Sequence, residues 1–250
     1  MGGMLKWFQK VATNPTEQLL QELKCDYWWH RDGNYYFVEG DIYLFDKRLT
    51  ELPDLSRVHL KGSFYCYKNN LTSLKGSPAR VYGAFDCSSN QLTTLDGAPA
   101  TVSSTFNCSS NHLTTLDGAP ATVGSFNCSS NQLTTLKGGP TSVDEVYWCN
   151  NNLLTTLEGA PAAVDIVFVC SDNLLTALEG APSRCKIKSD FGTFKSWNDV
   201  PENLRIAPEK KQKQQQEALQ TLVRDATVAQ APVAVPRRIR LHKNKPMQQS

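Results

Sequence analysis

Phe85-Asp86-Cys87-Ser88-Ser89-Asn90-Gln91-Leu92-Thr93-Thr94-Leu95-Asp96-Gly97-Ala98-Pro99 is a stretch that recurs, almost unchanged, down the middle of the chain. Its cysteine returns every 20 or 21 residues, at Cys66, Cys87, Cys108, Cys128, Cys149 and Cys170. An asparagine follows each cysteine by three residues, at Asn69, Asn90, Asn111, Asn131, Asn152 and Asn173. A motif repeated at fixed spacing in successive copies predicts a solenoid, in which stacked coils bury one continuous core.

Side-chain alternation along a short strand predicts which residues of each copy are buried. Phe85 and Cys87 face one way, and Asp86 and Ser88 face the other. Stacked coils should therefore bury one column of Phe and one of Cys. We expect the asparagine that follows to donate and accept hydrogen bonds between neighbouring coils, so that the six asparagines form a structural ladder.

The rest of each copy predicts a return limb without a helix. Gly97 permits a positive φ, Pro99 fixes its own φ, and Ala98 before the proline is held extended. The limb should be irregular or polyproline-like.

The pattern resembles the leucine-rich repeat, Leu-x-x-Leu-x-Leu-x-x-Asn-x-Leu, with Val, Phe and Cys at the three strand positions. The short period and the Leu-Thr-Thr-Leu-x-Gly-Ala-Pro return are similar to the short bacterial type of this repeat. They look closer still to repeat proteins encoded by bacteriophages, whose copies often begin with a segment like 38–44 of this chain. Over residues 38–185 the resemblance implies a leucine-rich-repeat-like curved parallel β-sheet. It implies no activity, because a fold does not fix a function.

The segments on either side of the repeats differ from them in composition. Asn14-Pro15-Thr16-Glu17 combines signals for a helix start, and residues 27–38 read as an aromatic hairpin. Ala218, Leu219, Leu222, Val223 and Ala226 fall on one helical stripe. The predicted organisation is an N-terminal helix and hairpin cap (1–40), the solenoid (41–188), a C-terminal cap (189–207), an amphipathic helix (208–228) and a basic flexible tail (229–250).

Eight cysteines could suggest a disulfide scaffold, but six of them occupy the same inward position of successive coils. Free cysteine behaves as a small hydrophobic residue, so we expect these six to be reduced core residues. Reduced cysteines and the lack of a long apolar run predict a cytoplasmic protein that does not contact a membrane.

Charge is distributed unevenly along the chain. From residue 208 onward, nine lysine and arginine residues stand against three acidic ones, although the whole chain carries only +2. A cluster of basic residues near the C-terminus offers electrostatic contacts for nucleic acid: Arg237, Arg238, Arg240, Lys243 and Lys245. A solvated tail without a partner is the alternative interpretation.

Catalytic chemistry finds little support in the sequence. The four histidines are scattered, and none stands beside the cysteines as a metal partner. Cys170-Ser171-Asp172 matches a short motif of bacterial ubiquitin ligases, but Cys170 is a core position of the repeat. We therefore expect a non-enzymatic protein without metal or cofactor.

The outward side of the repeat strands remains as the candidate binding surface, because repeat proteins commonly bind partners there. Its central positions are short and polar, whereas both ends carry large apolar or aromatic residues. These candidate partner-binding residues are Tyr43, Phe45, Tyr65 and Tyr67 at one end, and Val146, Trp148, Val167 and Val169 at the other. We expect a protein–protein interaction module of phage-related type that binds through the concave sheet face. The alternatives are coverage of these patches by the N-terminal segment and the 208–228 helix, and a virion assembly or nucleic-acid-associated factor acting through the basic tail.

Overall fold

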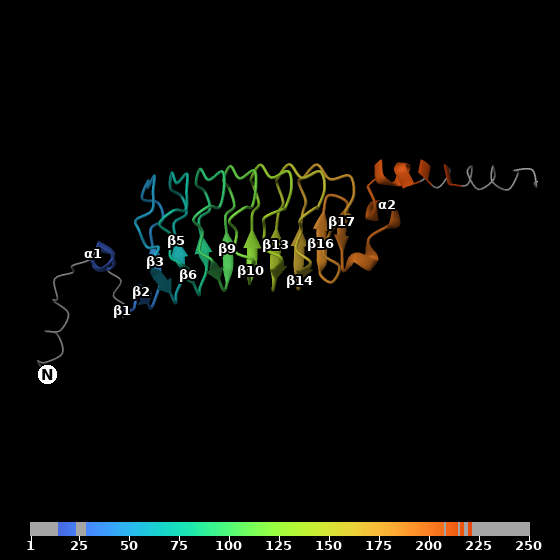
Figure 1. The fold of residues 1–250 in the computed structure, drawn as a ribbon. Helices are drawn as coiled ribbons and strands as arrows, with labels where there is room; N and C mark the ends of the chain where they lie inside the picture. Colours follow the sequence, from blue (N-terminus) through green and yellow to red (C-terminus); the bar gives the residue numbers. More distant parts are fainter. Residues whose placement is uncertain (1–14, 24–28, 208, 215, 218–219, 222–250) are drawn as a thin grey trace, which may run out of the picture. The chain divides into compact units, whose positions relative to one another are not determined.

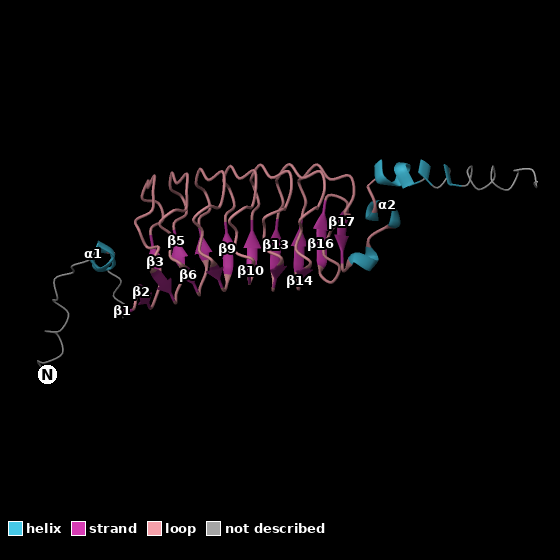
Figure 2. Cartoon of the chain, viewed as in Figure 1, coloured by secondary structure: helices cyan, strands magenta, loops and turns pink. Residues whose placement is uncertain are grey.

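The computed structural model describes residues 15–23, 29–207, 209–214, 216–217 and 220–221. The chain divides into two compact units, Met1–Ala207 and Pro208–Ser250. The first unit is a parallel β-solenoid whose coils stack in sequence order (Figure 1). Strands and loops build its coils, and Figure 2 shows the described helices before and after them. The predicted repeat solenoid is confirmed.

One long sheet runs through the first unit and has nine strands in sequence order. These are β3 (Ile42–Tyr43), β5 (Phe64–Tyr65), β7 (Phe85–Asp86), β9 (Thr105–Asn107), β11 (Ser125–Asn127), β13 (Val146–Trp148), β15 (Val167–Val169), β16 (Lys186–Ser189) and β17 (Gly192–Phe194). All neighbours pair in parallel except β16 and β17, which form an antiparallel hairpin. Equivalent residues of successive coils therefore stand beside each other in straight rows.

A second set of short strands precedes the strands of the long sheet from β3 to β15. A five-stranded sheet contains β1 (Trp29–Asp32), β2 (Tyr35–Val38), β4 (Val58–Leu60), β6 (Arg80–Val81) and β8 (Thr101–Val102), and a three-stranded sheet contains β10 (Thr122–Val123), β12 (Ser142–Val143) and β14 (Ala163–Val164). The expected hairpin is present as the antiparallel pair β1–β2, and β2 continues in parallel with β4.

These second sheets correct one expectation from the sequence, which placed Val, Phe and Cys on a single strand. Val81 lies on β6 and Phe85 on β7, because the chain bends between them. At the bend Gly83 approaches the preceding coil so closely that a Cβ atom would lie 2.7 Å from the carbonyl oxygen of Gly62. A side chain at Gly83 would collide with the preceding coil, and this contact is not visible in the alternation of a single copy.

The core contains the predicted columns. Phe64, Phe85, Phe106, Phe126, Tyr147 and Phe168 are fully buried, and their ring centroids follow one another at 5.3–5.6 Å. Aromatic neighbours at this separation add to the stabilisation gained from burying their area. The cysteine and leucine columns are buried beside them.

Each coil turns twice through left-handed backbone. The glycine of each return limb has φ between +82° and +96° from Gly76 to Gly180, and at Gly97 a Cβ atom would lie 2.5 Å from the backbone nitrogen of Lys75. Glycine is therefore required there. The second left-handed position comes directly before the ladder asparagine and holds ordinary residues, with φ of 53–57° at Lys68, Ser89, Ser110, Ser130, Asn151 and Asp172. The return limb between the ladder asparagine and the glycine contains neither helix nor strand, as predicted.

Short helices lie at both ends of the described part of the first unit. Helix α1 (Pro15–Glu22) buries Leu20, and Glu17 accepts a hydrogen bond from the hydroxyl of Tyr36 at 3.2 Å. The 3₁₀ helix η1 (Trp197–Asp199) and helix α2 (Glu202–Arg205) follow β17. Within the described residues, no helix combines the length and the apolar composition needed to cross a membrane.

The second unit is described only in part. Its described residues have helical backbone at 209–214, 216–217 and 220–221, inside the range predicted for the amphipathic helix. The predicted apolar stripe from Ala218 to Ala226 lies outside the described residues, and so does the basic tail.

Candidate binding face of the nine-stranded sheet

The outward side of the nine-stranded sheet carries every partner-binding residue expected from the sequence. Inward residues of each strand are buried, and the residues between them are partly or fully exposed. The parallel register joins the outward residues into rows that cross the strands. One row begins with Tyr43, Tyr65 and Asp86, and it continues through Asn107, Asn127, Trp148, Val169 and Lys188.

Four aromatic rings occupy the β3 end of this face. Tyr43 stacks on Tyr65 with centroids 5.3 Å apart, and Phe45 stacks on Tyr67 at 4.8 Å. Tyr43 and Phe45 are 53% and 39% exposed, and the hydroxyl of Tyr43 donates to Asp41 at 2.8 Å. The rings of each pair lie face to face along the row, so each ring covers one face of its neighbour.

The polar centre of the face is occupied by its own hydrogen bonds. The side-chain oxygen of Asn107 accepts from the backbone nitrogen and the hydroxyl of Ser109, at 3.2 and 2.8 Å. Asn127 holds Ser129 in the same way, and the amide of Asn107 donates to Asp86 at 3.2 Å. These polar groups stabilise the turn after the strand, so they offer little to a partner.

The apolar end of the face is a compact block on β13 and β15. Val146 pairs with Val167, and Trp148 pairs with Val169, so the four side chains form a two-by-two arrangement. All four are partly exposed. We call these four residues the Trp148 patch. An aromatic side chain within an apolar surface is typical of the residues that carry binding energy in protein interfaces.

Lysines border the Trp148 patch, and the sequence analysis did not count them among the site residues. Lys186 pairs with Val167, and Lys188 pairs with Val169, on the neighbouring strand β16. Lys195 directly follows β17, which pairs with β16, and all three lysines are exposed. The alternation of Cys185-Lys186-Ile187-Lys188 was the available signal, since it places both lysines on the side opposite buried Ile187.

The asparagine ladder lies beneath one edge of this face and holds the coils in register. The amide of Asn111 donates to the carbonyl oxygens of Cys87 and Cys108, both at 3.1 Å, and its oxygen accepts from Leu92 N at 3.0 Å. The other five asparagines of the predicted ladder make the same pattern of bonds. Lys47 stands at the equivalent place in the first coil, where its backbone nitrogen donates to Asn69 at 2.9 Å.

The cysteines are buried without forming disulfides in the described part of the chain. The Sγ atoms of Cys87, Cys108, Cys128 and Cys149 lie 3.3–3.4 Å from carbonyl oxygens of the next coil, to which they donate. Burial raises the pKa of Cys128 to about 12, and it raises the pKa of Cys170 to about 12 as well. Because the thiolate is the nucleophile, these cysteines are unsuited to covalent chemistry near neutral pH.

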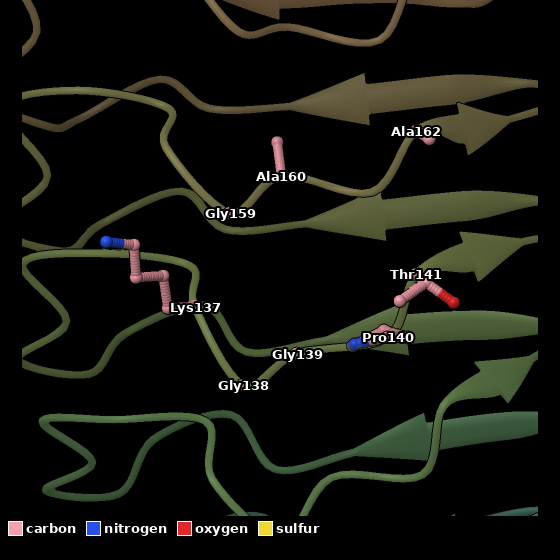
Figure 3. Close-up of a pocket in the computed structure, with 8 residues that line it drawn as sticks. All are labelled: Lys137, Gly138, Gly139, Pro140, Thr141, Gly159, Ala160 and Ala162. Atoms are coloured by element: carbon pink, nitrogen blue, oxygen red, sulfur yellow. The ribbon is translucent and has the colours of Figure 1, made fainter.

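A shallow depression of about 350 Å³ opens on the return limbs, over Gly138, Gly139 and Gly159 (Figure 3). Lys137 is the one titratable side chain that lines it. Gly139 stands where sister coils have Ala98, Ala119 and Ala160. Among the described residues, no cluster of three or more His, Cys, Asp or Glu side chains is arranged to hold a metal ion.

The tail contacts predicted at Arg237, Arg238, Arg240, Lys243 and Lys245 lie outside the described residues. Their role therefore stays a prediction, as does the coverage of the patches by terminal segments.

Comparison of the chain with protein-family models, curated proteins and solved structures finds no match.

Proposed function

We propose that this protein is a non-enzymatic interaction module that binds a protein partner through the outward face of its nine-stranded sheet. The observation that carries the proposal is the Trp148 patch, an apolar block in a row whose central members are short and polar. Aromatic anchors surrounded by apolar contacts commonly dominate the binding energy of an interface.

The repeat pattern supports the same proposal. The sequence motif resembles the leucine-rich repeats of bacteriophage type, and stacked repeats of that kind present extended surfaces to protein partners. In this proposal the terminal segments 1–40 and 189–207 cap the solenoid, and the protein acts in the cytoplasm.

The competing explanation for the Trp148 patch is coverage by another part of the same chain. Coverage predicts that the patch stabilises the fold, whereas a binding site predicts that it does not. Trp148→Ala therefore separates the two, because removal of a binding anchor costs about 2 kcal/mol or more of binding energy.

The experiment recovers partners from host cells with the full chain as bait and then compares Trp148→Ala with the wild type. Thr122→Ala is the matched control, since Thr122 is exposed on β10 and lies on a different sheet. We expect Trp148→Ala to lose the partner and to keep the melting temperature. Retained binding with lowered stability would contradict the proposal, and so would loss of binding in the Thr122→Ala control.

A further inference from the structure

The surface next to the Trp148 patch indicates the chemistry of the partner, and this inference rests on the function proposed above. We propose that the Trp148 patch, together with Lys186, Lys188 and Lys195, binds an acidic peptide segment of the partner. Apolar side chains of that segment contact Trp148 and its valines, and carboxylates three or so residues away contact the lysines.

The first support comes from the register of three neighbouring strands. One row runs Trp148, Val169, Lys188, and the adjacent row runs Val146, Val167, Lys186. Neighbouring strands lie about 4.8 Å apart, so the lysines stand about 10 Å from the strand of Trp148. An extended peptide that crosses the strands covers that distance in about three residues.

The second support is that these three lysines make no ion pair with the residues that the structure describes. In the part of the chain that the structure describes, the ion pairs are Lys61–Glu39 and Lys137–Glu158, and neither includes a lysine of this surface. The acidic residue nearest to Lys188 in the sequence is Asp190. Its carboxylate accepts hydrogen bonds from the backbone nitrogens of Asp172 and Asn173, at 2.8 and 3.5 Å. Three exposed lysines beside an apolar block therefore favour a partner with carboxylates.

Carboxylates before the starts of the strands give the site a direction. Glu145 and Asp165 stand at the bends before β13 and β15, and the Glu145 carboxylate accepts a hydrogen bond from the hydroxyl of Ser125 at 2.8 Å. Acidic groups of a partner are repelled at these bends and attracted at β16. The charges thus orient a bound peptide with its acidic part toward β16 and β17.

The charges and the composition of the patch argue against two other occupants. Residues 229–250 carry five basic residues and no acidic ones, so the lysines repel this tail. Single-stranded nucleic acid binds through several aromatic rings that stack on bases, and here one tryptophan stands among three valines. An acidic peptide with apolar residues satisfies both the patch and the lysines.

The test begins with a selection of random peptides displayed on a surface, with the full-length protein as bait. We expect the enriched peptides to carry more Asp and Glu than the starting library, close to aromatic or aliphatic residues. One enriched peptide is then labelled with fluorescein and titrated against the wild type, Trp148→Ala, and the double variant Lys186→Glu/Lys188→Glu. Lys68→Glu/Lys75→Glu is the control with the same change in charge, since both residues are exposed and lie on distant coils.

We expect the Lys186→Glu/Lys188→Glu variant to bind the peptide at least about tenfold more weakly, because two ion pairs are lost and replaced by repulsion. The control should change binding less than about twofold. An enriched peptide that needs Trp148 but is neutral or basic would overturn this inference. A peptide that binds the Lys186→Glu/Lys188→Glu variant as tightly as the wild type would overturn it too. Either result would leave the proposed function standing. Binding that is insensitive to Trp148→Ala, or a selection that enriches no peptide, would overturn both. If a single-stranded oligonucleotide bound the same site more strongly than the peptide, nucleic acid would become the proposed occupant in place of the peptide.

Discussion

Gly139 and Tyr147 are matched across two coils: a Cβ atom on Gly139 would lie 3.3 Å from the hydroxyl oxygen of Tyr147. Sister coils pair Ala98 with Phe106 and Ala119 with Phe126 at the same places. The chain thus replaces alanine by glycine at the one described coil where the buried ring carries a hydroxyl group. That hydroxyl lies 3.9 Å from Cys128 Sγ.

The pair predicts a coupled stability effect. Gly139→Ala alone should destabilise the protein by about 1–3 kcal/mol, as expected for an overpacked core. In the Tyr147→Phe background the same change should cost less, because the contact with the hydroxyl is removed while those with Leu116 Cδ1 at 2.9 Å and Leu136 O at 3.1 Å remain. Urea melts of the four proteins measure this coupling. An equal cost of Gly139→Ala in both backgrounds would contradict it.

The asparagine ladder predicts a large effect at one residue and almost none at the next. Asn111→Ala removes three hydrogen bonds between buried groups, and we expect a loss of about 1–3 kcal/mol in the free energy of unfolding. His112→Gln is the neighbouring control, since His112 is exposed and sister coils already hold Gln91 and Gln132. Its cost should stay below about 0.5 kcal/mol. Similar midpoints for both variants in denaturant would show that the ladder does not hold the coils together.

The buried cysteines predict slow reaction with thiol reagents. Cys87, Cys108 and Cys128 are inaccessible, and burial raises the pKa of each thiol, so little thiolate is present or reachable in the folded protein. Labelling followed by peptide mapping should be slow at these three residues and become fast in denaturant. Rapid labelling of the native protein, or disulfides in a non-reducing map, would refute the assignment.

The left-handed residue before each ladder asparagine predicts a stabilising substitution. Ser110 has φ of 55°, a conformation that costs an ordinary residue about 1 kcal/mol relative to glycine. We expect Ser110→Gly to stabilise the protein by about 0.5–1 kcal/mol. Thr114→Gly, at an exposed position of the same coil without positive φ, should instead destabilise it. A melting temperature that falls in both variants would contradict the prediction.

The basic tail leads to a test of the alternative function. Five basic residues between 237 and 245 can neutralise up to five phosphates, so duplex DNA affinity would fall by up to about 500-fold between 50 and 200 mM salt. A chain that ends at residue 207 should lack this binding entirely. Absence of DNA binding by the full chain at 50 mM salt would remove the nucleic-acid interpretation.

Features that depend on a single copy of the repeat could be predicted from the sequence. Alternation placed Phe85 and Cys87 inside, and the need for positive φ explained Gly97. The role of the six asparagines followed from one amide per coil at a turn. For each of these residues, the physical constraint can be recognised within a single repeat of about twenty residues.

Features that depend on contact between coils could not be predicted in this way. Gly83 is required at its bend because a Cβ atom there would lie 2.7 Å from the carbonyl oxygen of Gly62 in the preceding coil. Ser89 and Ser110 adopt a left-handed conformation that the serine residue type does not predict. The ladder bonds on both sides impose it. Lys186 and Lys188 join the Trp148 patch only through the register of β15 and β16.

The asparagine ladder also has a direction along the chain. Asn90 bonds to Cys66 O and Leu71 N of the coil before it, and Asn111 does the same for the coil that contains Asn90. A coil therefore receives its inter-coil side-chain bonds from residues that follow it by 19–24 positions. During synthesis on the ribosome, each turn of the growing chain must wait for its successor to emerge before its backbone is fully satisfied. After the last asparagine of the ladder, the carboxylate of Asp190 accepts hydrogen bonds from the backbone of that final turn.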